Sequence, residues 1–216
     1  MTQARASVYD GAPSDLDVAH HETGHALVAV ALGYRLHTVT IAPDVSAETL
    51  GRVTTLCIGR PDRAQLAADI AHGGREARLR ARHAAIGDAL FAGAGYAAEA
   101  LQTQQARVRL PLLLTPVDDL PEGDVRNWNA ALYLAAADSW GSAVRGASWC
   151  ASLLQRYMAA RRPLLDDLAA LLIRERTVEG EAFRDAVHES AERRGVELWA
   201  PELLSSWWQR RAAGAR

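Results

Sequence analysis

Residues 14–33 read SDLDVAHHETGHALVAVALG, and this stretch combines the signals of a buried helix with three polar side chains inside it. Ser14 followed by Asp17 is typical of a helix N-terminus, and Gly33 is typical of a helix end, so the sequence predicts a helix that runs to about Leu32. Its apolar residues are small, which allows the helix to be buried. A buried helix that carries a His-Glu-His set needs a partner for those polar groups, such as a metal ion.

The polar set is His21-Glu22-Thr23-Gly24-His25. Because residues four apart share one helix face, the imidazoles of His21 and His25 can bind a single metal ion. Glu22 then lies close enough to take a proton from a metal-bound water without being a ligand itself. Zinc lowers the pKa of such a water towards neutrality, which makes hydroxide available to attack a carbonyl. The motif therefore predicts a zinc hydrolase.

A catalytic zinc site takes three protein ligands and leaves one position for water, so a third donor is expected. The extended HExxHxxGxxH motif is absent, since position 31 is alanine. Spacing alone leaves five acidic residues as candidates, with three histidines less favoured. These are Glu48, Glu99, Asp118, Asp119 and Asp124, and then His37, His72 and His83.

The composition is that of an ordinary globular protein, with 49% apolar and 23% charged residues among 216. The formal net charge of -2 gives no reason to expect nucleic acid or a membrane surface as a partner. All 24 basic residues are arginine, which excludes lysine chemistry and a phosphate-binding P-loop. Only Cys57 and Cys150 occur, and they fit a reducing compartment as small buried residues. Without a signal-peptide core or a membrane-length apolar run, we expect a cytoplasmic protein.

The rest of the chain predicts a small β element followed by helices. Leu36–Ala42 and Gly51–Ile58 have the alternation and Thr/Val content of strands. An exposed edge there could accept a peptide as an added strand, or the element could be a purely structural hairpin. The predicted helices are Arg63–His72, Arg75–Leu101, Asp124–Ser139, Ser148–Arg176 with Pro163 as a kink or restart, and Gly180–Arg194, with a break at Gln102–Gly123.

We expect three regions along the chain: a loose leader over 1–13, a peptidase domain over 14–195, and a Trp-rich tail over 196–216. The tail contains Trp199, Trp207 and Trp208, which could anchor a partner or pack back on the same chain.

Several short motifs occur in a fixed order over residues 17–190. They are Ala19–Leu27 (AHHETGHAL), Val39–Pro43 (VTIAP), Gly51–Thr54 (GRVT), Gly93–Leu101 (GAGYAAEAL), Gly123–Val125 with Asn129–Ala131, Trp140-Gly141 and Ser152–Val187. In this order they resemble the peptidase domain of the FtsH-type ATP-dependent zinc metalloproteases. The resemblance implies a mainly α, zincin-like fold with a small β element beside the HExxH helix.

The resemblance also implies roles for single residues. His21, His25 and Asp124 would be the zinc ligands and Glu22 the general base. Val39–Ala42 or its neighbouring strand would help to hold an extended substrate. On these grounds we expect a zinc-dependent metalloendopeptidase; the alternative is a zinc-binding regulatory or adaptor module derived from such a peptidase.

Some features depart from the family pattern. The stretch between Glu99 and Asp124 is longer than expected, so Asp118 or Asp119 could be the third ligand instead, and Thr23 replaces the usual alanine. We expect Glu99 to orient a histidine more readily than to bind the metal, although a glutamate third ligand (Glu48 or Glu99) stays open. The ATPase motor and membrane helices of the family have no counterpart here. We therefore expect unfolded or flexible polypeptide substrates, with a separate ATPase and a homo-hexamer as further possible partners.

Overall fold

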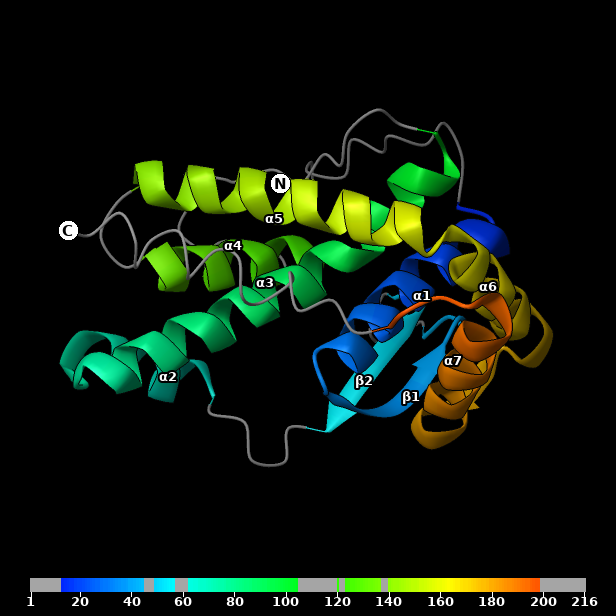
Figure 1. Cartoon of the computed structure of the whole chain (residues 1–216), viewed down its shortest axis with the longest axis horizontal. Helices are drawn as coiled ribbons and strands as arrows, with labels where there is room; N and C mark the ends of the chain where they lie inside the picture. The colour runs from blue at the N-terminus through cyan, green and yellow to red at the C-terminus, as the bar shows by residue number, and fades with distance from the viewer. Residues whose placement is uncertain are drawn as a thin grey trace.

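The computed structural model describes residues 13–44, 49–56, 62–104, 120, 123–136 and 140–198. Within them the protein is mainly helical with one small sheet, which confirms the predicted mainly α class (Figure 1). The elements are α1 (Asp15–Ala31), β1 (Arg35–Thr40), β2 (Arg52–Leu56), α2 (Arg63–His72), α3 (Arg75–Gln102), α4 (Asp124–Ala136), α5 (Trp140–Ala160), α6 (Arg162–Glu175), β3 (Thr177–Glu179) and α7 (Gly180–Arg194).

Helix α1 lies in the middle of the molecule, with α3, α4 and α5 on one side and the sheet, α6 and α7 on the other (Figure 1). It begins at a capping box, in which Ser14 and Asp17 each bond the other's backbone N–H, and it ends before Gly33 in the left-handed region (φ 73°). Its helix neighbour α3 comes so close that a Cβ at Gly24 would lie 2.6 Å from the backbone oxygen of Ala94. Both predicted helix boundaries are confirmed, and the small residues explain the close packing.

The sheet has the strand order β2-β1-β3, with antiparallel pairing throughout. Val39 of β1 pairs with Val53 on one side and Val178 on the other. Both edges of β1 are occupied at Val39 and Thr40, so of the two predicted substrate-binding strands, Val39–Ala42 or its neighbour, the neighbour is left. The neighbouring strand β2 has no second partner among the described strands. Strand β3 was not predicted, since three residues are too few to show a periodic pattern.

The helical region differs from prediction between α4 and α6. Helix α5 begins at Trp140 rather than Ser148, because Ala143 and Ala147 extend its buried face towards the N-terminus. Of the two predicted alternatives at Pro163, a kink or a restart, the structure has the restart: Pro163 lies in the first turn of α6, where its missing N–H is tolerated. Helix α4 begins at its predicted residue and ends at Ala136; residues 137–139 lie outside the described part.

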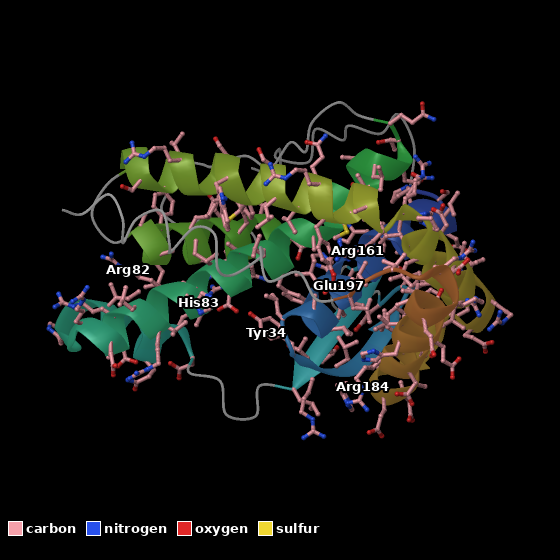
Figure 2. The ribbon with its side chains drawn as sticks, in the orientation of Figure 1. Tyr34, Arg82, His83, Arg161, Arg184 and Glu197 are labelled. Atoms are coloured by element: carbon pink, nitrogen blue, oxygen red, sulfur yellow. The ribbon has the colours of Figure 1, made fainter. Side chains whose placement is uncertain are left out.

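The described start of the tail, Val196–Leu198, packs back on α5 and α6. The hydroxyl of Tyr157 donates to the backbone oxygen of Leu198 at 3.2 Å, and Arg161 donates to that of Glu197 at 2.5 Å (Figure 2). Burial raises the pKa of the Cys150 thiol, in keeping with a structural role. The leader up to residue 12, Cys57 and the three tail tryptophans lie outside the described residues. No described helix is long and apolar enough to cross a membrane.

Candidate metal centre

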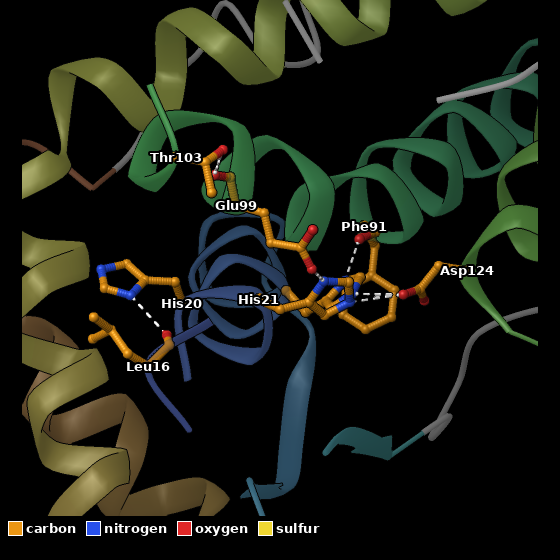
Figure 3. Close-up of polar contacts among 8 residues, drawn as sticks. Leu16, His20, His21, Phe91, Glu99, Thr103 and Asp124 are labelled. Atoms are coloured by element: carbon orange, nitrogen blue, oxygen red, sulfur yellow. Dashed lines mark hydrogen bonds and ion pairs between the residues drawn. The ribbon is translucent and has the colours of Figure 1, made fainter. Parts of the chain in front are cut away.

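Three side chains from two helices meet at one point beside α1 (Figure 3). The Oδ2 atom of Asp124 lies 2.9 Å from Nε2 of His21 and 3.1 Å from Nε2 of His25. The two Nε2 atoms are 3.0 Å apart. The histidines share one face of α1, whereas Asp124 is the first residue of α4. The fold thus brings the two histidines of α1 together with an aspartate that follows them by 103 and 99 residues along the chain.

In each histidine, the ring nitrogen that points away from Asp124, Nδ1, makes a hydrogen bond. Nδ1 of His25 lies 2.7 Å from the backbone oxygen of Phe91, which can only accept, so this nitrogen carries the proton. Nδ1 of His21 lies 2.5 Å from Oε1 of Glu99 and donates to that carboxylate in the same way. In the neutral tautomers, both Nε2 atoms therefore present a lone pair to the Oδ2 atom of Asp124. Three electron-pair donors that face one another need a cation between them.

The spacing and chemistry of the three donors fit zinc. Two ligands about 2.0–2.1 Å from one tetrahedral ion lie about 3.3 Å from each other, close to the 2.9–3.1 Å found among these atoms. Two imidazoles and one carboxylate form a borderline-soft donor set that suits zinc better than magnesium or calcium, which prefer oxygen ligands. A set of three protein ligands also matches the number in catalytic zinc sites.

One stripe of α3 supports both histidines. Phe91, Gly95 and Glu99 follow one another at intervals of four and so lie on one helix face. Phe91 and Glu99 fix the imidazole of His25 and His21 respectively through the hydrogen bonds described above. Between them, a Cβ at Gly95 would lie 2.5 Å from Nε2 of His21, so only glycine leaves room for that ring.

The electrostatics of the site favour positive charge. Burial lowers the pKa of His21, but its hydrogen bonds with Asp124 and Glu99 raise that pKa to about 10. Burial also lowers the pKa of His25, and the charge of Asp124 raises it above the usual range. Conversely, burial raises the pKa of Asp124, yet the two histidines hold it well below its usual value. A proton or a metal ion at the shared position is therefore strongly stabilised.

No protein-family model matches the chain, and no curated protein matches it either.

The predicted site residues are placed as follows. His21, His25 and Asp124 converge, and Glu22 lies next to them on α1. Glu99 contacts Nδ1 of His21, as expected of a residue that orients a ligand. The less favoured His37, His72 and His83 are not part of the group of potential ligands in the described chain, and Glu48, Asp118 and Asp119 lie outside the described residues.

Glu22 is buried, with 6% of its surface exposed. Burial raises the pKa of its carboxyl, although the two neighbouring histidines lower it in part. Its side chain packs against Gly51, at the start of β2, and no hydrogen bond joins it to another described residue. The carboxylate thus lies beside the metal-binding group. Because no other described residue hydrogen-bonds its oxygens, they can accept a proton.

Sequence reasoning missed the residues that act through their backbone or through their small size. Neither the carbonyl of Phe91 nor the room left by Gly95 and Gly51 depends on a reactive side chain. The one usable signal was spacing: Gly95 precedes Glu99 by four residues in the GAGYAAEAL motif, which puts both on one helix face.

Proposed function

We propose that the protein is a zinc-dependent metalloendopeptidase in which His21, His25 and Asp124 bind the ion and Glu22 is the general base. The observation that carries the proposal is the convergence of two imidazole lone pairs and one carboxylate oxygen beside a buried glutamate that no other described residue hydrogen-bonds. A site that only stored zinc has no need of Glu22, whose burial costs free energy.

The protein's own groups divide the chemistry between them. A bound zinc ion supplies Lewis-acid polarisation of the substrate carbonyl and a water of lowered pKa. Glu22 takes the proton from the attacking water and later returns it to the leaving amine. Its raised pKa suits this exchange, because a carboxyl that titrates nearer to neutral pH both accepts and releases the proton readily. Glu99 and the Phe91 carbonyl keep the imidazoles oriented throughout.

An extended polypeptide is the substrate class that fits best. The outer edge of β2 has no partner among the described strands, and β2 begins next to Gly51, which contacts Glu22. A peptide added along that edge would run past the general base with its backbone hydrogen-bonded to the sheet. Such binding requires an unfolded or flexible segment, since a folded protein does not offer a free strand.

The resemblance to FtsH-type peptidases extends the proposal to assembly and location. A homo-hexamer follows from that resemblance, and a separate ATPase in the cytoplasm is the proposed source of folded substrates. Light scattering coupled to gel filtration tests the hexamer directly.

The deciding experiment measures cleavage of casein, an unstructured protein, by the zinc-loaded protein without ATP. We expect casein cleavage by the wild type and a rate at least about 100-fold lower in Glu22→Gln, with equal zinc content in both by mass spectrometry. Glu76→Gln makes the same chemical change at an exposed position of α3, and it should cleave casein like the wild type. A Glu22→Gln variant that cleaves casein like the wild type would refute the mechanism. Bound zinc without cleavage by the wild type would favour a regulatory or adaptor module.

A further inference from the structure

We propose that Gly51 is a positioning residue for the general base: its bare backbone defines the place of the Glu22 carboxylate. This inference rests on the proposed peptidase function. A Cβ atom at position 51 would lie 2.8 Å from both Cγ and Oε1 of Glu22, and 2.8 Å from Cγ1 of Val18. Gly51 is thus in direct contact with the one group that the proposed mechanism uses for proton transfer.

Among the described residues, packing is what holds this carboxylate. Glu22 is almost fully buried, and no hydrogen bond from another described residue fixes its oxygens. The contact surface of Gly51 therefore limits the rotamers that the side chain can adopt. Gly51 in turn is held by the sheet, because the next residues, Arg52 and Val53, pair with Thr40 and Val39 of β1.

A methyl group at position 51 should move the side chain of Glu22 and leave the fold intact. Contacts below 3.0 Å essentially never occur for a real Cβ, so something must shift. The three atoms it meets, Cγ and Oε1 of Glu22 and Cγ1 of Val18, all belong to side chains, so a change of rotamer can relieve the contacts without moving the backbone. None of the three nearest atoms belongs to His21, His25 or Asp124, so the metal-binding group is left in place.

The test is Gly51→Ala in the full chain, assayed on casein and on a short fluorogenic peptide. A displacement of about 1 Å at a reacting group can cost about 100-fold in rate, so we expect kcat to fall by about that factor. KM and zinc content should stay at wild-type values. Gly74→Ala is the matched control, since a Cβ there meets no atom within 4 Å, and it should leave kcat unchanged.

Two double variants separate action through Glu22 from a general structural effect. Adding Gly51→Ala to Glu22→Gln should cause no further loss of residual activity, because the group that Gly51 positions is already disabled. Adding Val18→Ala to Gly51→Ala should not restore kcat, because it relieves only the contact with Val18.

Failure of this inference is distinct from failure of the proposed function. An inactive, zinc-loaded wild type overturns the function itself. An active wild type with an equally active Gly51→Ala variant overturns only the positioning role, as does loss of zinc from that variant or full additivity with Glu22→Gln.

Discussion

Asp124 is the one of the three proposed ligands that comes from α4, and the other two come from α1. Asp124→Asn replaces its anionic oxygen by a weak neutral donor, and we expect zinc affinity to fall by more than about 100-fold, since even residues that merely support a ligand are worth 10–100-fold. Competition with a fluorescent chelator measures the affinity. Asp166→Asn is the control: Asp166 pairs with His20, next to the first ligand, but contributes no donor to the group. Full zinc occupancy in Asp124→Asn would exclude Asp124 as a ligand.

The proton at the shared position makes zinc binding depend on pH. The folded-state pKa of His21, about 10, lies above the ordinary histidine value of 6.5. Protonated His21 therefore stabilises the metal-free fold; this contribution is fully present below about pH 6.5 and is lost as the pH rises towards 10. Zinc must displace that proton, so zinc affinity should rise about tenfold per pH unit for each proton released in this window. Calorimetry in buffers of different ionisation enthalpy counts the protons; an affinity that is flat between pH 6 and 8 would contradict the assignment.

Gly95 has a different effect from Gly51, because it faces a ligand rather than the base. In Gly95→Ala the new methyl group would overlap the ring of His21, which the bond to Glu99 prevents from moving freely. We expect zinc affinity to fall at least tenfold while thermal stability without metal changes little, since alanine favours the helix over glycine by about 0.5–1 kcal/mol. Chelator competition and circular dichroism give the two readouts. Unchanged zinc affinity would show that the ring can move without losing the metal.

At the scale of elements, the contact between α1 and α3 is sensitive to added volume. A Cβ at Gly24 would meet the backbone oxygen of Ala94 at 2.6 Å, and backbone cannot turn aside as a side chain can. Gly24→Ala must push the two helices apart, which we expect to cost about 1–3 kcal/mol of unfolding free energy. Urea denaturation measures this cost, with Gly74→Ala as the control that meets no atom. A loss below about 0.5 kcal/mol would mean that the helices can shift without cost.

The elements themselves were largely predictable from local patterns. Helix α2 has the bounds that its apolar spacing and flanking residues predicted. Strand β2 falls inside its predicted range, and β1 begins one residue before its predicted start at Leu36. The errors occur where tertiary packing decides. Strand β3 exists because Val178 pairs with Val39, and no pattern within three residues could indicate that pairing. In α5, Gly141 and Gly146 have a low helix propensity, so the start of this helix was not predicted, although burial stabilises it.

At the scale of the molecule, a bound ion should tie α1 to α4 and so stabilise the whole fold. With free zinc at about 100 times Kd, the gain in unfolding free energy is about 2.7 kcal/mol. We therefore expect EDTA to lower Tm by several degrees in the wild type and to leave Asp124→Asn unchanged. Differential scanning calorimetry with and without chelator provides the measurement. An equal shift in both proteins would indicate metal binding elsewhere.

The site could be predicted only in part, for reasons that also lie at this scale. The HExxH spacing is local, so it identified His21, Glu22 and His25 directly. Asp124 required the order of motifs along the chain, because nothing in the sequence around it indicates that α4 begins beside α1. The supporting stripe on α3 depends on how closely two helices approach, and that distance follows from packing of the complete core.

The position of α1 between the other elements has a consequence for how the proposed activity would be lost on heating. Its residues from Ala19 to Ala29 are buried without a break except His21, which is half-buried, and its neighbours come from both halves of the chain. Backbone amides in such a helix exchange with solvent only when the entire domain opens. The metal ligands should therefore never separate in a partly open form, and heat inactivation should follow the same transition as exchange of the α1 amides. The activity that remains after heating would then be proportional to the fraction of fully folded molecules.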